Sequence, residues 1–336
     1  MKPTDFSKYI SGFILKYLPD ERGASANTIN AYSTTFVLLL NFMQNKKQVK
    51  IEKLTLDKIK KETVLDFLDW LQKERNCGDS TRNLRLAAIH SFYKYLQYES
   101  LENLHECQKI LSIKLKKTRK GSINYLTIEG IKLLLQQPDI ATIKGRRDLA
   151  LLSLMYDTGA RVQEIIDLTP SMLRLDKPAT IKIIGKGNKA RIVPMLEAQV
   201  GLLKNYLKEN RLNEPFANMY PLFSNSRKEK LTRAGVNYIV QKYADKAILN
   251  KMIIPDKISC HSLRHSKAMH LLQAGVNLVY IRDILGHVSI QTTEVYARAD
   301  SKQKREALEK AYVDINPGEE PKWVKDEGLI TWLKKF

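Results

Sequence analysis

A short basic run divides this chain into two regions in which the apolar residues follow different patterns. Residues 113–122, IKLKKTRKGS, hold five basic residues in ten and few apolar ones. Before this run, apolar residues recur at steps of three and four; after it, helix-length segments alternate with short β-prone runs. A charged, poorly packing run between two periodic regions is typical of an interdomain linker. The 336 residues are therefore expected to form two domains.

The region before the linker is predicted to form helices only. Asn27 is expected to cap a helix with an apolar face from Ile29 to Met43, and a second stripe runs from Val64 to Leu71. Ser80 is expected to cap a third helix that reaches Tyr95. Basic residues lie outside the apolar stripe of this third helix, where they form either a solvated face or a contact with a DNA groove: Arg82, Arg85 and Lys94.

The region after the linker has a mixed pattern. Two β-prone runs, 181–184 and 191–193, flank GKGNK and predict a hairpin with a turn rich in Gly and Asn. Helices are expected over 149–155, 231–247, 261–273, 277–285 and 292–299. The predicted fold is mainly α with a small antiparallel β-sheet. Its parts are a helical domain (1–112), the linker (113–122), a mixed, mostly helical domain (123–313) and a C-terminal tail (314–336).

The charge of the chain indicates a polyanionic partner. Lys and Arg number 56 against 36 Asp and Glu, a net charge of +20, and the excess is present on both sides of residue 121. Nucleic acid is favoured over a membrane surface, and both domains are expected to contact it. The three cysteines lie far apart and form no CxxC motif, and the chain begins without an apolar leader, so we expect a cytoplasmic protein without disulfides or a zinc site.

Six residues in the second region supply the groups that a phosphodiester transfer needs. They are Arg161 in TGARVQEIIDL, Lys186 in IIGKGNKARIVP, His261 and Arg264 in HSLRH, and His287 and Tyr296 in LGHVSIQTTEVYAR. The planar fork of an arginine binds two phosphate oxygens and stays charged at working pH. A tyrosine, with an ordinary pKa near 10, becomes a nucleophile once a base takes its proton. His261 is the candidate base, and the two arginines are expected to favour the phenolate.

Metal catalysis is not expected from this set. His261 and His265 have the i, i+4 spacing of zinc ligands, but further ligands have no evident source and clustered acidic residues are lacking. His265 follows Arg264 directly and is expected to face elsewhere on the helix. It is therefore left out of the predicted site.

In order, local context and spacing, these four segments resemble the tyrosine recombinase (lambda integrase-like) family, which includes Xer-type and mobile-element integrases. The resemblance covers roughly residues 25–312. It implies that Tyr296 attacks a phosphate to form a 3′-phosphotyrosyl link, with Arg161 and Arg264 on the phosphate oxygens. It also implies that Lys186, with Lys189 as a rival, is the general acid, that His287 donates to a phosphate oxygen, and that Glu164 supports the active-site histidine. No ATP, metal or other cofactor is implied.

The resemblance also implies partners. The helical domain would be a core-binding domain, and basic linker residues would neutralise DNA phosphates: Lys116, Lys117, Arg119 and Lys120. The implied assembly is a homotetramer on two double-stranded DNA sites, a dimer on each, that passes through a Holliday junction, with the tail at 314–336 docked on a neighbouring subunit or folded back on its own domain. Accessory proteins, the DNA site and the setting (mobile element, phage or chromosome resolution) stay open. The alternatives are a type IB topoisomerase and a catalytically idle DNA-binding protein.

Overall fold

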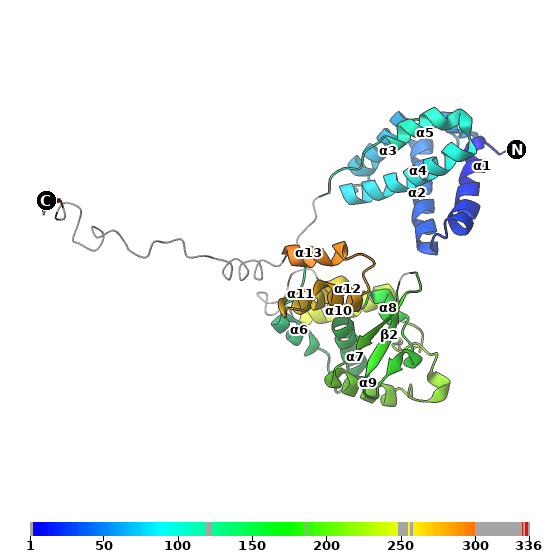
Figure 1. The fold of residues 1–336 in the computed structure, drawn as a ribbon. Helices are drawn as coiled ribbons and strands as arrows, with labels where there is room; N and C mark the ends of the chain where they lie inside the picture. The colour runs from blue at the N-terminus through cyan, green and yellow to red at the C-terminus, as the bar shows by residue number, and fades with distance from the viewer. Residues whose placement is uncertain are drawn as a thin grey trace. The chain divides into compact units, whose positions relative to one another are not determined.

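The structure is a computed structural model that describes residues 3–118, 123–185, 187–247, 255, 258–299, 331, 333 and 334. The chain separates into two compact units, Met1–Gly121 and Ser122–Phe336 (Figure 1). Each unit has its own hydrophobic core.

The first unit is helical throughout the part that the structure describes. Its longer elements are α1 (Asp5–Gly12), the π-helical η1 (Phe13–Glu21), α2 (Ala26–Asn45), α3 (Lys61–Lys73), α4 (Asp79–Glu99) and α5 (Leu104–Leu111). Short 3₁₀ turns connect them: η2 (Ile51–Lys53), η3 (Leu56–Lys58) and η4 (Leu101–Asn103). The core centres on edge-to-face aromatic contacts, in which the Phe92 ring lies 5.4 Å from Phe13 and 5.3 Å from Phe36.

Several details of this unit differ from the sequence prediction. Helix α2 is capped by Ser25 rather than Asn27, because the Ser25 hydroxyl accepts from the amide of Thr28. Helix α4 begins at Asp79, one residue before the expected cap Ser80. Helix α1 and the segment η1 occupy a stretch in which the sequence analysis delimited no individual helix, since Pro19 and the π-helical turns of η1 obscure the usual 3.6-residue period.

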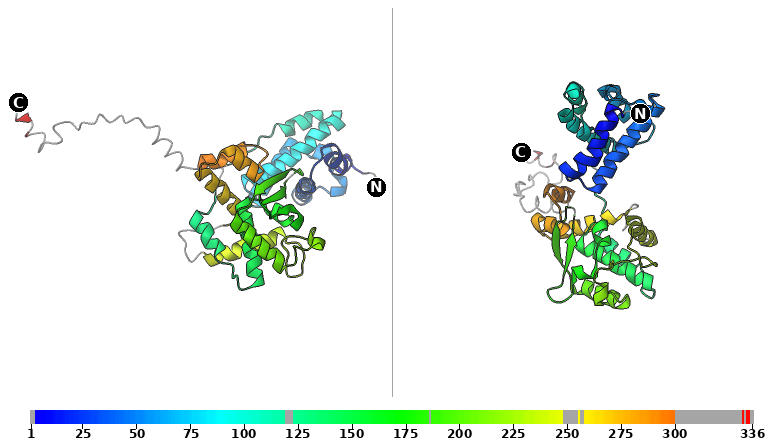
Figure 2. Two further views of the ribbon diagram at one scale, coloured as in Figure 1. Left: turned by 60° about the horizontal axis from the view of Figure 1, so that its bottom comes forward. Right: turned by 90° about the vertical axis from the view of Figure 1, so that its right-hand side faces the viewer.

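The second unit places helices against a small sheet. Its elements are α6 (Ile128–Leu135), α7 (Ile143–Thr158), α8 (Val162–Ile166), η5 (Pro170–Met172), β1 (Leu173–Arg174), β2 (Thr180–Ile184), β3 (Ala190–Pro194), α9 (Glu197–Glu209), η6 (Pro215–Ala217), α10 (Arg233–Ala247), α11 (Cys260–Gln273), α12 (Leu278–Leu285) and α13 (Gln291–Ala299). The strands pair antiparallel in the order β1-β2-β3, with Ile183 opposite Arg191. Ile181 and Ile183 are buried, and in the right-hand view of Figure 2 the strands run along one side of the helices.

The prediction of a mainly helical fold with a small antiparallel sheet is confirmed, and the predicted hairpin is β2–β3. Strand β1, of two residues, was not predicted. Helix α7 packs against α11, which in turn contacts α12 and α13. These four helices therefore bring together segments that are far apart in the sequence.

Candidate active site

A tight turn after α7 positions Arg161. The helix ends at Gly159, whose φ of +56° is left-handed, and a Cβ there would lie 2.5 Å from the side chain of Leu285. Only glycine therefore allows this turn to approach α12 so closely. Arg161 is the N-cap residue of α8, and its Nη2 donates to the carbonyl of Gly286 at 3.2 Å.

Arg264 holds the same turn from α11. Its guanidinium is buried and donates to the carbonyl of Gly159 at 2.6 Å and to that of Leu285 at 2.7 Å. Burial, with the nearby charge of Arg161, lowers the pKa of Arg264 to about 10. The side chain thus remains a cation at neutral pH, and the two arginines place positive charge at the C-terminal end of α12.

The hydroxyl of Tyr296 lies beside His265. Its oxygen is 2.9 Å from Nδ1 of His265, and the side chain of Tyr296 is only 4% exposed. Burial raises the pKa of Tyr296 and outweighs the opposite effect of Arg264 and Arg161. As expected, the charges of the two arginines act to lower the pKa of Tyr296. The effect of burial is larger, so the phenol is favoured over the phenolate in the protein without DNA. Burial also lowers the pKa of His265, helped by His261 and Arg264, which favours a neutral ring.

The structure corrects the expected direction of His265. His265, which was left out of the predicted site, makes the hydrogen bond to Tyr296, because α13 packs against the face of α11 that carries it. His261 is the more exposed of the two, and its ring centre is 6.3 Å from that of His265. Partial desolvation, together with the charges of Arg264 and Arg161, lowers the pKa of His261. Both histidines border the site, but His265 is the one in contact with the nucleophile candidate.

His287 also lies next to Tyr296. Their rings are nearly parallel, with centres 6.3 Å apart, and Nδ1 of His287 is 2.8 Å from the hydroxyl of the buried Thr293. Burial, followed by the charges of Arg264, Arg161 and Arg191, lowers the pKa of His287 to about 4. The ring is therefore neutral at physiological pH.

The hydrogen bonds of the Glu164 side chain in this structure go to two arginines, Arg161 and Arg191. One carboxylate oxygen accepts from Nη1 of Arg161 at 2.8 Å, and the other accepts from the Arg161 amide at 2.9 Å and from Nη2 of Arg191 at 2.6 Å. Burial opposes ionisation, but these donors outweigh it and hold the pKa of Glu164 below its usual range. Arg191, on β3, was missed by the sequence analysis, since no motif singled it out.

A hollow of about 520 Å³ opens at these residues. Its lining has four cationic side chains, Arg161, Lys189, Arg191 and Arg282, and also includes Asp283 and His287. Lys186, the predicted general acid, lies outside the described residues. Among the described residues, no group of three or more His, Cys, Asp or Glu side chains could hold a metal ion.

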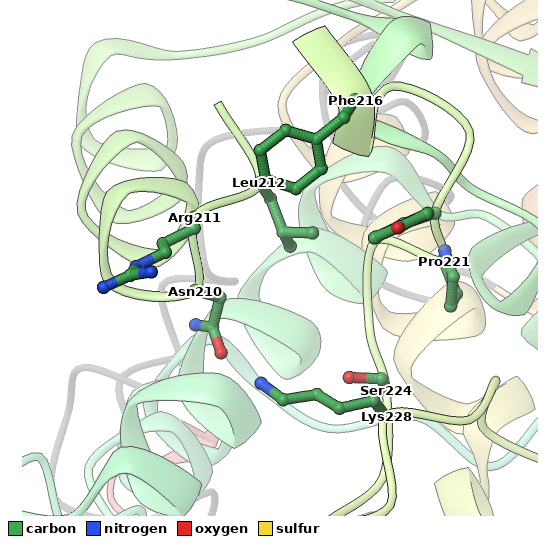
Figure 3. A pocket seen from close by; sticks show the side chains of 8 residues that line it. Asn210, Arg211, Leu212, Phe216, Pro221, Ser224 and Lys228 are labelled. Carbon is green, nitrogen blue, oxygen red and sulfur yellow. The ribbon is translucent and has the colours of Figure 1, made fainter. Parts of the chain in front are cut away.

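A second hollow, of about 610 Å³, is lined by the segment that connects α9 to α10 (Figure 3). It is lined by Leu212, Phe216 and Lys228 among others and includes none of the predicted catalytic residues. The first hollow, which adjoins Arg161 and His287, is therefore the candidate phosphate site.

The predicted DNA contacts in the first unit divide into two groups. Arg82 is only 5% exposed, and Arg85 donates to the carbonyl of Ala31 and the hydroxyl of Thr35, so both are engaged within their own unit rather than presented on a free face. Lys94, Lys116 and Lys117 are exposed. Arg119 and Lys120 lie outside the described residues.

The first half of the basic run is better packed than its composition predicts. Ile113 is buried in the first unit's core, and the backbone of Lys116 exchanges two hydrogen bonds with the side chain of Asn83. The ammonium of Lys116 also donates to Gln72 at 2.6 Å.

This arrangement agrees with what the chain is similar to. Residues 124–303 match the phage integrase family, and residues 12–100 match the N-terminal SAM-like domain of phage integrases. A Sinorhizobium fredii protein that bears an integrase/recombinase name, y4rC, is 33% identical over 336 residues, which is 100% of this chain and 99% of that protein. The tyrosine recombinase XerD of Listeria monocytogenes is 32% identical over 286 residues, 84% of this chain and 91% of XerD.

Solved structures show the same likeness. A crystal structure of the XerH site-specific recombinase, bound to its difH substrate, superposes with a TM-score of 0.65 and 25% identity over 89% of this chain and 84% of XerH. The chain belongs to the phage integrase, or tyrosine recombinase, family, whose members carry out site-specific DNA recombination.

Proposed function

We propose that this protein recombines DNA with Tyr296 as its nucleophile. The observation that carries the proposal is the position of the Tyr296 hydroxyl, within hydrogen-bond distance of His265 and close enough to Arg264 and Arg161 for their charges to act on its ionisation. The phenol is buried and protonated, so it needs both a base and an incoming phosphate. A DNA phosphate, with its negative charge, would bind where the arginine forks concentrate positive charge.

Proton transfer from Tyr296 is assigned to His265. A neutral Nδ1 that faces the phenol can accept its proton as the oxygen attacks phosphorus. The bond from phosphorus to the 5′-oxygen then breaks, and the leaving oxygen takes a proton from Lys186. The products are a 3′-phosphotyrosyl link and a free 5′-hydroxyl, and bond energy is kept in the link, so the balance needs neither ATP nor an oxidant.

His287 is assigned to a non-bridging oxygen of the same phosphate. If the Thr293 hydroxyl donates to Nδ1, the neutral ring carries its proton on Nε2 and can donate it. Arg161 and Arg264 neutralise the charge that becomes more exposed in the transition state. Removal of one such preorganised donor typically costs about 10²–10³ in rate.

Recombination requires the reversal of this step on a partner duplex. A 5′-hydroxyl of the second DNA attacks the phosphotyrosyl link, and two rounds of exchange pass through a Holliday junction. We propose a homotetramer on two specific double-stranded sites, a dimer per site, in the cytoplasm, with residues 1–112 as core-binding domain and 123–313 as catalytic domain. The net charge of +20 supports the DNA partner. Within the described chain, no helix has the length and apolarity to cross a membrane.

Joining of two labelled duplexes that carry the same site tests the proposal. The expected product is a strand joined between the two DNAs, together with four-armed intermediates. Relaxation of supercoils without such joints would assign the chain to the topoisomerase alternative, and DNA binding without cleavage would assign it to the idle alternative.

A further inference from the structure

Three consecutive carbonyls at the end of α12 are each capped by a different arginine. The carbonyl of Ile284 accepts from Nε of Arg191 at 2.9 Å, that of Leu285 from Arg264 at 2.7 Å, and that of Gly286 from Arg161 at 3.2 Å. The last carbonyls of a helix lack partners within the helix and carry its negative partial charge, so they attract guanidinium groups. The end of α12 therefore holds two proposed phosphate ligands and Arg191 in one row.

Arg191 differs from Arg161 in its exposure and in its contacts. Its side chain is 10% exposed, against 35% for Arg161. Its Nη2 is occupied by Glu164 and its Nε by Ile284, whereas Arg161 and Glu164 pair through Nη1. Arg161 is thus the more accessible of the two to a ligand, whereas two nitrogens of Arg191 already have partners within the protein.

Glu164 couples Arg161 and Arg191 electrostatically. One carboxylate shared between two guanidinium groups compensates each only partly, so Arg161 keeps positive charge for a phosphate. Without Arg191, the carboxylate would be left to Arg161 alone. It would then compensate Arg161 more fully and draw its fork toward α8.

The guanidinium of Arg191 is closely packed against the C-terminal end of α12. A Cβ placed on Gly286 would lie 2.8 Å from Nη1 of Arg191, and one on Gly185 would lie 3.2 Å from Glu164 and 3.6 Å from Nη1 of Arg191. The guanidinium therefore fills the space between the β2–β3 hairpin, α8 and the end of α12.

We propose that Arg191 is a positioning residue of the strand-transfer reaction. It shares the charge of Glu164 and so keeps the fork of Arg161 oriented toward the scissile phosphate and incompletely neutralised. The inference rests on the proposed function, because it assigns Arg161 to the phosphate. It does not place Arg191 on the DNA.

The test compares two suicide duplexes, one with an ordinary scissile phosphate and one with a neutral methylphosphonate at that position. At saturating protein, Arg191→Lys is expected to cleave the ordinary substrate about 10²-fold more slowly than the wild type, the typical cost of a misplaced catalytic group. On the methylphosphonate, which leaves Arg161 little charge to neutralise, the variant should cleave within a few-fold of the wild type. The matched control is Arg146→Lys, which alters an exposed arginine–carboxylate pair with Glu209 in the same unit and should change neither rate.

A double-mutant cycle checks the route through Glu164. If Arg191 acts through this carboxylate, the losses caused by Arg191→Lys and Glu164→Gln should not add. The double variant should then cleave at about the rate of the slower single variant. Should Arg191→Lys fail to fold, Glu164→Gln alone must show the same recovery on the methylphosphonate.

Three results would overturn the inference: an equal loss on both substrates, an unchanged rate on the ordinary one, or a loss that disappears at saturating protein because only DNA affinity has changed. Tyr296→Phe serves as the separate control for the proposed function. Covalent cleavage that survives in this variant would refute the nucleophile, whatever Arg191 does.

Discussion

The contact between Arg191 and Gly286 gives a sharp prediction because the same unit contains a matched glycine. Gly286 and Gly275 both have left-handed φ angles, +64° and +81°. An added Cβ would lie 2.8 Å from Nη1 of Arg191 at Gly286, but would have no heavy atom within 4 Å at Gly275. Alanine at either position should therefore incur the backbone penalty of about 1–2 kcal/mol, and only Gly286→Ala should also displace Arg191.

The size of that displacement follows from the distances. Relief of the 2.8 Å approach to an ordinary contact of about 3.5 Å requires a shift of about 0.7 Å. The bond from Nε of Arg191 to Ile284, now 2.9 Å, would lengthen to about 3.6 Å, at which it is no longer a hydrogen bond. Loss of a bond to a charged group adds about 1.5–3 kcal/mol. Gly286→Ala should thus cost roughly 2.5–5 kcal/mol of unfolding free energy in total.

Denaturant unfolding and single-turnover cleavage of a suicide duplex measure the two consequences. Gly275→Ala should lose stability but cleave at the wild-type rate once folded, whereas Gly286→Ala should also cleave more slowly, by about 10²-fold. Equal losses of stability in the two variants, with unimpaired cleavage by both, would refute the reasoning that the guanidinium needs this space.

Three further predictions concern individual groups. Lys186→Ala should be rescued by a 5′-bridging phosphorothiolate, whose thiolate leaves without a proton; failure of that rescue with measurable cleavage would favour Lys189. His265→Ala should slow cleavage by about 10²–10⁴-fold and recover partly at high pH, as loss of a base requires, and a larger loss in His261→Ala would return the role to His261. The pKa of His287 is lowered from 6.5 to about 4, so its contribution to stability is complete above about 6.5 and is lost as the pH falls toward 4. His287→Gln should reduce the loss of thermal stability over this window, and an unchanged pH profile would contradict the burial of a neutral ring.

The residues that the sequence could identify are those in short motifs. Arg161, Arg264, His287 and Tyr296 each occur in such a segment, and the structure gathers them around the end of α12 and the face of α13. The sequence analysis could assign these four residues to one site from their motifs, without knowledge of how the helices pack. The roles assigned to them stay predictions.

His265 was missed because neighbouring residues on a helix point about 100° apart. The sequence analysis assumed that the site lies only on the face of the helix that carries Arg264, and it therefore left out His265. In the structure the site spans both directions, since Arg264 reaches the end of α12 while His265 reaches Tyr296 on α13. Only the packing of two helices on α11 reveals this.

Charge patterns do not show which cations have partners within the protein, for a related reason. Periodicity identifies the apolar stripe of a helix but not which flanking charges a neighbouring helix covers. Arg85 bonds to α2 at Ala31 and Thr35, and Arg191 on β3 is buried against Glu164 from α8. Such partners lie 27 or more residues away in the sequence, so no local pattern indicates them.

The identity of the tyrosine that joins DNA is the most direct test of the account. A suicide duplex should trap the protein covalently, and mass spectrometry of the digested complex should find the 3′-phosphate on the peptide that contains Tyr296. Tyr296→Phe should bind the same DNA with nearly unchanged affinity and form no adduct, because only the nucleophilic oxygen is lost. An adduct on another residue, or one that persists in the phenylalanine variant, would contradict the central claim.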